Sequence, residues 1–443
     1  MSDRPSRAAG AERAIAACLW GGAVVLRVHN AVRFPLDGTA DARLGHLDYV
    51  RWIGTHWRQP PAALNWETWQ PPLYYWVSAV AWRVAGCWSA RPDDLFAAPQ
   101  ALVLALLPTA CGLIAAWLAL RTVRSVVPDD PLARLVTLAL VLFIPMHVML
   151  APWVRNDLLT VLLVSVVAWR LTTAPDLGTL PPRTAVLLGL VVGLALLTKY
   201  TGSGALVALV ASLGLAATAA PQPRATLGGL VGAVVIAALV AGWFYADHWI
   251  RFGRAFVTPA DWLGGFQQPP GVRGVGDFLR FPPAVFVRPW VQDPAVIHSL
   301  WAGTYATAWF DGHYIFLSHY LARPTAEWLG RVLLILGVVP TLALLAGATV
   351  AAVETARGRR LLPWGPLLVL AGWTLVGYVY LNAEAPYYSA VKAHYLLPAL
   401  VPGAAFVALA VARAPRWARV LVGVDVAAVV VVSGVTFCFG LVG

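Results

Sequence analysis

The chain has 443 residues, of which 59% are hydrophobic and only 12% are charged, and its mean hydropathy is +0.70. This composition cannot supply the charged surface of a soluble domain, so we expect a polytopic membrane protein. The net charge of +11 could suggest a nucleic-acid partner, but most arginines fall in short loops between apolar runs, as the positive-inside rule requires. The four cysteines stand singly in apolar stretches without CxxC or Cys/His spacing, so the sequence suggests neither a disulfide framework nor a zinc site.

The first apolar span runs from residue 14 to about residue 32 and follows Arg4, Arg7 and Arg13. No clean small-residue cleavage site follows it, so we interpret it as an uncleaved span. Most later apolar segments approach the length at which a helix crosses ~30 Å of hydrocarbon, and they lack the alternation of a β-barrel. We therefore expect an all-α bundle. The later segments are 72–86, 96–120, 131–151, 157–173, 184–199, 202–219, 226–249, 328–352, 361–381, 394–413 and 419–440.

The arginines also predict the orientation of the bundle. Three arginines before the first span place the N-terminus inside. A second group of three places the 353–361 loop inside, and a third group of three does the same for the loop near residue 416. The two long polar stretches, 34–71 and 251–327, then lie outside.

Seven apolar segments separate the two outside stretches, and an odd number of crossings cannot join two loops on the same side. One segment must therefore not cross. We assign this role to segment 72–86, because it is short, begins at the Pro71-Pro72 pair and contains Arg83. The prediction is about eleven spans with the C-terminus outside.

The first outside stretch gathers acidic residues in a chain that otherwise avoids charge; they are Asp37, Asp41, Asp48 and Glu67. A helix beginning at Asp41 would place His46 and Tyr49 near one face and Asp48 on another. Its apolar side chains would rest on the bilayer, and these are Leu44, Leu47 and Ile53. From spacing alone, Asp41 is equally well interpreted as a helix cap in the first turn.

Four short motifs follow one another along the chain. The first combines Asp41, His46 and Tyr49 with an acidic residue, Glu67, shortly before a QPPLYY segment at 70–75. The others are VRNDLLTVLL at 154–163, GLALLTKYTG at 193–202 and VKAHYLLPALVP at 391–402. Together, over residues 30 to 402, they resemble the membrane glycosyltransferases of the GT-C fold. The closest branch is glycosyltransferase family 39, with the protein mannosyltransferases and the aminoarabinose transferase of lipid A.

The resemblance implies a reaction in which a sugar on a polyprenyl phosphate passes, with inversion, to an acceptor on the non-cytoplasmic face. One carboxylate of the first loop acts there as general base, and Asp41 matches its position. Members of the family often have Asp-Glu at this point, whereas here Ala42 follows. This departure leaves Asp37 and Asp48 as competitors for the role.

The leaving lipid phosphate needs fixed cations in a water-poor site. The aminoarabinose transferase branch has a lysine directly before Pro-Pro-Leu, and this chain has Gln70. The cation must then come from elsewhere, with Arg58, Arg280, Arg288 and Lys392 as candidates. Lys392 could equally be an interfacial lysine. We expect donor and phosphate contacts from His46, Tyr49, Glu67, Gln70, Tyr74, Lys199, Arg288, Lys392 and His394.

Two further charged residues stand beside apolar runs. Asp157 matches a second carboxylate of the family, thought to shape the site or bind a metal, and we count it with Asp41 as catalytic. A helix cap paired with Arg155 is an equally good interpretation. A divalent cation between Asp41 and Asp157 is an option, although two carboxylates do not define a site. Lys199 needs a partner, and we favour a structural or donor-phosphate role for it.

The second outside stretch contains an aromatic piece at 298–314 with possible sugar-stacking residues. We favour interfacial packing of a short amphipathic helix there. The polar and aromatic residues of this piece are His298, Trp301, Trp309, Asp311 and His313, and Glu384, Tyr387 and Tyr388 could line the same face.

The sequence thus predicts one glycosyltransferase domain over 1–443, with loop 34–71 catalytic, loop 251–327 covering the substrate and 328–443 forming the C-terminal helices. A transporter or flippase is the alternative, but it should show repeated halves with matching midplane charges, and the acids here gather in one loop. A lipid-diphosphate donor also remains open. The expected partners are a polyprenyl-phosphate sugar, the bilayer of the inner or plasma membrane, and a glycan, lipid or protein acceptor. Because no soluble acceptor-binding domain is appended, we prefer a lipid-linked or small acceptor.

Overall fold

The computed structural model describes residues 4–39, 42–62, 64–173, 180–219, 222–257, 268–358 and 361–438. Within these ranges the protein is built from helices, and its only extended pairing is an isolated bridge between Pro270 and Tyr387. The predicted all-α class is confirmed.

The α-helices are α1 (Arg4–Arg33), α2 (Leu47–His56), α3 (Leu73–Gly86), α4 (Ala98–Val126), α5 (Pro131–Phe143), α6 (Pro145–Leu150), α7 (Asp157–Thr173), α8 (Pro182–Leu196), α9 (Ser203–Ala219), α10 (Pro223–Phe252), α11 (Leu300–Trp309), α12 (Arg323–Leu336), α13 (Val338–Ala356), α14 (Leu361–Glu384), α15 (Leu400–Arg413) and α16 (Arg416–Thr436). Most of them coincide with the predicted apolar segments, whereas α2 and α11 lie in the two predicted polar stretches. Short helical turns include η1 (Ala42–His46), η2 (Tyr200–Gly202), η4 (Val275–Phe278), η5 (Pro283–Phe286), η6 (Leu317–His319), η7 (Tyr388–Ala390) and η8 (Ala393–Ala399).

Among the described residues, eight helical segments are long and apolar enough to cross a membrane, and α5 and α8 are shorter apolar helices. The chain is therefore an integral membrane protein. Separate helices α8 and α9 confirm that the 184–219 region forms two segments. The expected total of about eleven crossings stays a prediction, because length and composition alone select eight.

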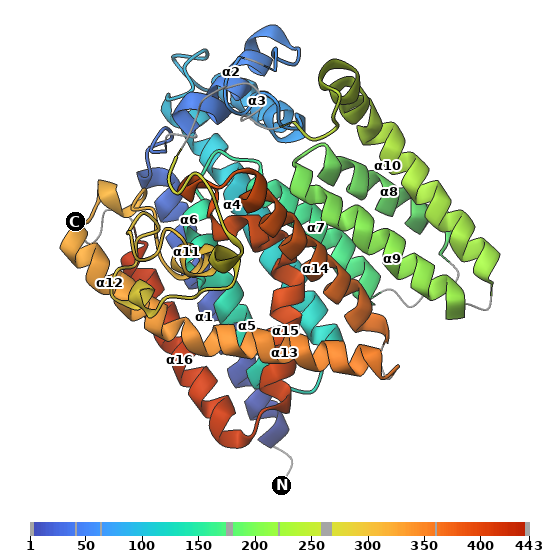
Figure 1. The fold of residues 1–443 in the computed structure, drawn as a ribbon, viewed down its shortest axis with the longest axis vertical. Helices are drawn as coiled ribbons and strands as arrows, with labels where there is room; N and C mark the ends of the chain where they lie inside the picture. The colour runs from blue at the N-terminus through green and yellow to red at the C-terminus, as the bar shows by residue number, and fades with distance from the viewer. Residues whose placement is uncertain are drawn as a thin grey trace.

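Helices α2 and α3 lie together at one end of the bundle, and the N-terminal end of α1 lies at the other (Figure 1). The apolar face of α2 packs on α3 and the start of α4, and Leu47 and Ile53 are fully covered there. The Trp82 ring sits so close to α2 that a side chain at Gly54 would overlap it. The prediction that Leu47 and Ile53 rest on the bilayer is therefore wrong, because α3 covers them; the side chain of Leu44 lies outside the described residues.

A break between α5 and α6 at Pro145 turns the chain toward the start of α7. A proline leaves the carbonyls before it without their usual helical partners, which is costly in a membrane unless side chains replace them. Each replacement comes from a different helix: His147 of α6 bonds the Val141 carbonyl (2.7 Å), Arg27 of α1 bonds that of Leu142 (2.7 Å), and Ser433 of α16 bonds that of Phe143 (2.7 Å).

Helices α8 and α10 approach each other through small residues. Gly189 faces the backbone of Ala233, and Gly193 faces Ala237 and Val240, so tightly that added Cβ atoms would lie 2.5 and 2.6 Å from their nearest neighbours. Two glycines four residues apart on one helix, facing alanines four apart on another, are typical of close packing in membranes. This contact fixes the end of α8, from which the next turn leads to Lys199.

Candidate functional site

Several connecting segments of the bundle meet at the end where α2 and α3 lie (Figure 1). The Leu73 N–H donates to the carbonyl of Leu197 (2.8 Å), and the Asn156 amide donates to that of Thr198 (3.1 Å). We call this region the loop end. It comprises residues 34–39, 42–62, 64–72, 151–156, 197–202, 310–316 and 387–399.

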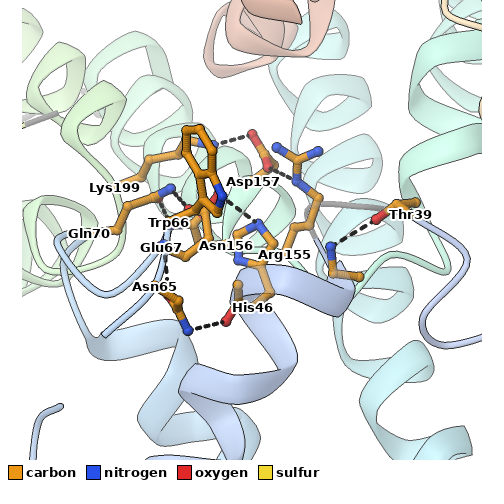
Figure 2. Close-up of polar contacts among 12 residues, drawn as sticks. Thr39, His46, Asn65, Trp66, Glu67, Gln70, Arg155, Asn156, Asp157 and Lys199 are labelled. Carbon is orange, nitrogen blue, oxygen red and sulfur yellow. Dashed lines mark hydrogen bonds and ion pairs between the residues drawn. The ribbon is translucent and has the colours of Figure 1, made fainter. Parts of the chain in front are cut away.

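Asp157, the first residue of α7, is the centre of a buried cluster of charge at the loop end (Figure 2). One carboxylate oxygen lies 2.7 Å from the Lys199 ammonium, and the other lies 3.2 Å from Nε of Arg155. The ring nitrogen Nε2 of His394 lies 3.7 Å from the first oxygen. Two cations and a histidine thus surround a single carboxylate, and the buried Glu67 carboxylate also attracts Lys199.

Local structure explains why Lys199 reaches Asp157. The η2 turn folds back so tightly onto the end of α8 that a Cβ at Gly202 would lie 2.2 Å from the Ala195 carbonyl oxygen. Only glycine fits there. The Lys199 ammonium also lies 5.1 Å from the centre of the Tyr395 ring, in a cation–π arrangement.

A second polar group joins the first loop to this cluster. The Gln70 amide donates to the Glu67 carboxylate and accepts from Asn156, the neighbour of Asp157 in the chain. Glu67, Gln70 and Asn156 are all buried, and His46 lies 3.7 Å from Glu67. Figure 2 shows this group beside Asp157 and Lys199.

Aromatic side chains hold the first loop in position. His46 is hydrogen bonded to the Tyr75 hydroxyl (2.8 Å), and Tyr49 stacks on the Tyr75 ring with centroids 3.8 Å apart. The Tyr49 hydroxyl donates to the carbonyl of Gln70 (3.2 Å), and Tyr74 is fully buried beside it. The predicted faces of the 41–53 helix are confirmed, because His46 and Tyr49 are covered while the Asp48 side chain is 48% exposed.

A small cavity of about 40 Å³ adjoins the cluster, between α6, the segment after α11 and η8. Its polar lining comes from Thr307, Asp311, His313, Lys392 and His394, and methionine, aromatic and aliphatic residues form the rest. One oxygen of Asp311 accepts from the N–H groups of Phe316 (2.7 Å) and Leu317 (3.0 Å). Burial nevertheless raises the pKa of the Asp311 carboxyl to about 6.

The structure brings most of the expected donor contacts together, and it leaves Arg288 apart. The Arg288 side chain is 59% exposed and lies 3.6 Å from Asp293, beside α12 and away from Asp157. Arg280, another cation candidate, is exposed and near Asp277. Arg58 lies on the exposed side of α2, with its guanidinium 6.0 Å from the Trp52 ring. Asp41, the expected base, lies outside the described residues.

Helix α11 lies inside the protein, between α6, α12 and η8, so the interpretation of residues 298–314 as an interfacial amphipathic helix is wrong. Its Trp301 and Trp309 indole N–H groups donate to the Phe278 carbonyl (2.6 Å) and the Thr341 hydroxyl (3.0 Å), which identifies packing roles. The surrounding elements cover its polar face as well as its apolar one.

Sequence reasoning left the partner of Lys199 unknown, and the partner is Asp157. It also missed Asn156 and Tyr75 as members of the network. The adjacency of Asn156 to Asp157 is a signal that could have found the first. Nothing in the sequence distinguishes Tyr75 from Tyr74, because their roles depend on which way each ring points from α3.

The donor set around Asp157 does not fit a metal ion, because both carboxylate oxygens face cations. Among the residues with described positions, no group of three or more His, Cys, Asp and Glu side chains is placed to hold one. The contacts of Asp157 therefore do not support the predicted cation between Asp41 and Asp157, and Asp41 lies outside the described residues.

No family model matches the sequence, and no curated protein matches it. Solved structures do match the fold. The oligosaccharyltransferase of Archaeoglobus fulgidus with Zn and sulfate is 15% identical, with a TM-score of 0.52 over 94% of this chain and 53% of the other. The oligosaccharyltransferase AglB from Archaeoglobus fulgidus, in complex with an inhibitory peptide and a dolichol-phosphate, is 14% identical, with a TM-score of 0.50 over 97% of this chain and 56% of the other. ArnT from Cupriavidus metallidurans bound to undecaprenyl phosphate is 16% identical, with a TM-score of 0.39 over 93% and 79%.

The chain therefore has a fold of the GT-C type, as the sequence motifs suggest. It spans about half the length of the oligosaccharyltransferases that it matches.

Proposed function

We propose that this protein is a membrane glycosyltransferase that moves a sugar from a polyprenyl-phosphate donor to an acceptor at the non-cytoplasmic membrane surface. The observation that carries the proposal is the Asp157 cluster, in which Lys199 and Arg155 are fixed on one buried carboxylate beside the Gln70 segment. The GT-C fold supports the class of reaction, and the polyprenyl-phosphate ligands of AglB and ArnT support the class of donor.

The first part of the proposed chemistry is stabilisation of the leaving phosphate. As the bond between the sugar C1 and the phosphate oxygen breaks, the phosphate gains negative charge, and cations already in place stabilise it without reorganisation. Gln70 is neutral and is bonded to Glu67 and Asn156, so it supplies no charge. We assign the charge to Lys199 and Arg155, with Lys392 in the lining of the adjoining cavity.

The second part is activation of the acceptor. The acceptor oxygen or nitrogen attacks C1 from the face opposite the phosphate, its proton passes to a carboxylate, and the polyprenyl phosphate departs with the bonding electron pair. We assign the base to Asp41, which directly precedes η1 in the chain. Asp157 does not suit this role, because its oxygens are engaged by cations.

The test is sugar transfer in vesicles with Asp41→Asn, and Asp48→Asn is the matched control on the same loop. We expect Asp41→Asn to lower transfer by about 10²- to 10⁴-fold, which is the usual contribution of a positioned general base. Asp48 is half exposed and pairs with Arg51, so its variant should stay within about twofold of wild type.

Donor binding and thermal stability of Asp41→Asn should match wild type. Unchanged transfer by Asp41→Asn would remove Asp41 from the mechanism, and a collapse in Asp48→Asn instead would move the base to that residue. The anomeric configuration of the product, read by NMR, tests inversion separately.

A further inference from the structure

A second cavity, of about 570 Å³, lies at the end of the bundle opposite the loop end. It opens between the first turns of α1, the last turns of α4 and the start of α5. The N-terminal end of α1 lies at this end in Figure 1. Its polar lining comes from Glu12, Arg13, Arg124 and Arg134.

The charge within this cavity is unevenly distributed. Glu12 is the only carboxylate that lines it, and both Glu12 oxygens accept from Arg134, each at 2.8 Å. The nearby Asp130 forms an ion pair with Arg419 (2.7 Å) and accepts a hydrogen bond from the N–H of Ala133. Arg13 and Arg124 are exposed at the cavity, and among the described residues neither has a carboxylate within ion-pair distance. Two guanidinium groups from different helices therefore face the same space.

The remaining lining residues are apolar, and most of them belong to α1. Ala16, Ala17 and Trp20 follow Arg13 on this helix, where the apolar span Ala9–Arg33 enters the membrane. The span of α4 ends at Val126, on the other side of the cavity. A groove with arginines at its outer end and small and aromatic residues at its inner end matches the polar and apolar parts of a lipid.

We infer that this cavity binds an anionic phospholipid, with its phosphate between Arg13 and Arg124 and an acyl chain along Ala16 and Trp20. Guanidinium groups donate paired hydrogen bonds to phosphate oxygens, and Arg13 of α1 and Arg124 of α4 both line this cavity. The Glu12–Arg134 pair stays intact and sets the depth of the headgroup. This site is independent of the proposed glycosyl transfer, because it lies at the other end of the bundle.

The experiment measures binding of the first phosphatidylglycerol molecule to the full chain in neutral detergent, by native mass spectrometry. The pocket variant is Arg13→Gln/Arg124→Gln. The control is Arg121→Gln/Arg416→Gln, which removes the same charge from exposed arginines outside the cavity. Each arginine contributes about 1 kcal/mol to the free energy of binding an anionic lipid. The pocket variant should therefore bind phosphatidylglycerol about thirtyfold more weakly than wild type, and the control should bind it as wild type does.

Phosphatidylcholine and glycerol 3-phosphate complete the design. Weak binding of both to wild type is expected, because the first lacks net charge and the second lacks acyl chains. Equal loss in the pocket and control variants would show that net charge alone attracts the lipid, and would overturn the site. Tight, variant-sensitive binding of glycerol 3-phosphate would reassign the cavity to a soluble phosphate.

Discussion

Asp157 occupies a position where a single buried carboxylate is shared by two cations. Removing an ion from water is costly, and the attraction of a close partner repays that cost only where the geometry is good. Lys199 at 2.7 Å and Arg155 at 3.2 Å meet this requirement for Asp157. Glu67 also attracts Lys199, and the proposed phosphate would add a negative charge that both cations stabilise.

Replacing Lys199 by Met should lower sugar transfer by about 10²- to 10³-fold, because a fixed cation near the leaving group is lost. Arg155 still neutralises Asp157, so the variant should remain folded. The measurement is transfer in vesicles together with the melting temperature.

The double variant Asp157→Asn/Lys199→Met separates a structural pair from a phosphate ligand. If Lys199 serves only to neutralise Asp157, removing both charges restores transfer. We expect transfer to stay low in the double variant, and recovery would contradict the assignment.

Asp311 is a buried carboxyl group in the lining of the small cavity next to the Asp157 cluster. Its contribution to the free energy of unfolding depends on pH. Burial raises its pKa to about 6, above the ordinary value of 3.8, so the folded state prefers the protonated form. The folded state therefore loses stability relative to the unfolded state as the pH rises from about 4 through 6. The loss is at most about 3 kcal/mol and is complete above that range.

Asp311→Asn mimics the protonated carboxyl and still accepts hydrogen bonds from Phe316 and Leu317. We expect the melting temperature of wild type to fall relative to that of Asp311→Asn between pH 4 and pH 7, and to stay parallel to it above pH 7. Parallel curves across the whole range would show that Asp311 does not titrate there.

At the scale of elements, the contact between α8 and α10 shows how small residues position a functional turn. Gly189 lies against backbone atoms of Ala233, which cannot rotate away as a side chain would. Displacement of α8 would move the turn that presents Lys199. Packing within the bundle therefore influences the site without any polar contact.

Gly189→Val should destabilise the protein by about 1–3 kcal/mol, because the new side chain overlaps α10. Gly232→Val, on α10 itself, is the control, since a Cβ there meets nothing within 4 Å. Melting temperatures in detergent compare the two. A Gly189→Val protein as stable as the control would show that α8 and α10 separate freely.

At the scale of the whole molecule, the orientation predicts which surfaces reagents can reach. In a cysteine-free background, Trp88→Cys and Leu279→Cys should react with a membrane-impermeant maleimide added from outside, since both positions are well exposed. Arg357→Cys should react only after the membrane is opened. Labelling of Arg357→Cys from outside would reverse the orientation and place the Asp157 cluster on the cytoplasmic side.

The positions of the helices could be predicted because a membrane span needs a continuous apolar run, which is local information in the sequence. The contact of Asp157 with Lys199 and His394 could not, because it depends on how α7, α8 and η8 pack. The prediction that Leu47 and Ile53 contact the bilayer is wrong for a related reason. The apolar face of a helix has the same sequence pattern whether lipid or another helix covers it. The family resemblance, in contrast, selects Asp157, Lys199 and His394 individually from their positions in the motifs.

The corner between α5 and α6 has a consequence for biosynthesis. Its Phe143 carbonyl is bonded by Ser433, which the ribosome adds after nearly all the other helices. The corner therefore remains incomplete in the nascent chain while α6 to α15 enter the membrane. A chain interrupted before α16 would leave this carbonyl without its hydroxyl partner, and the bend would lack one of the three bonds that support it.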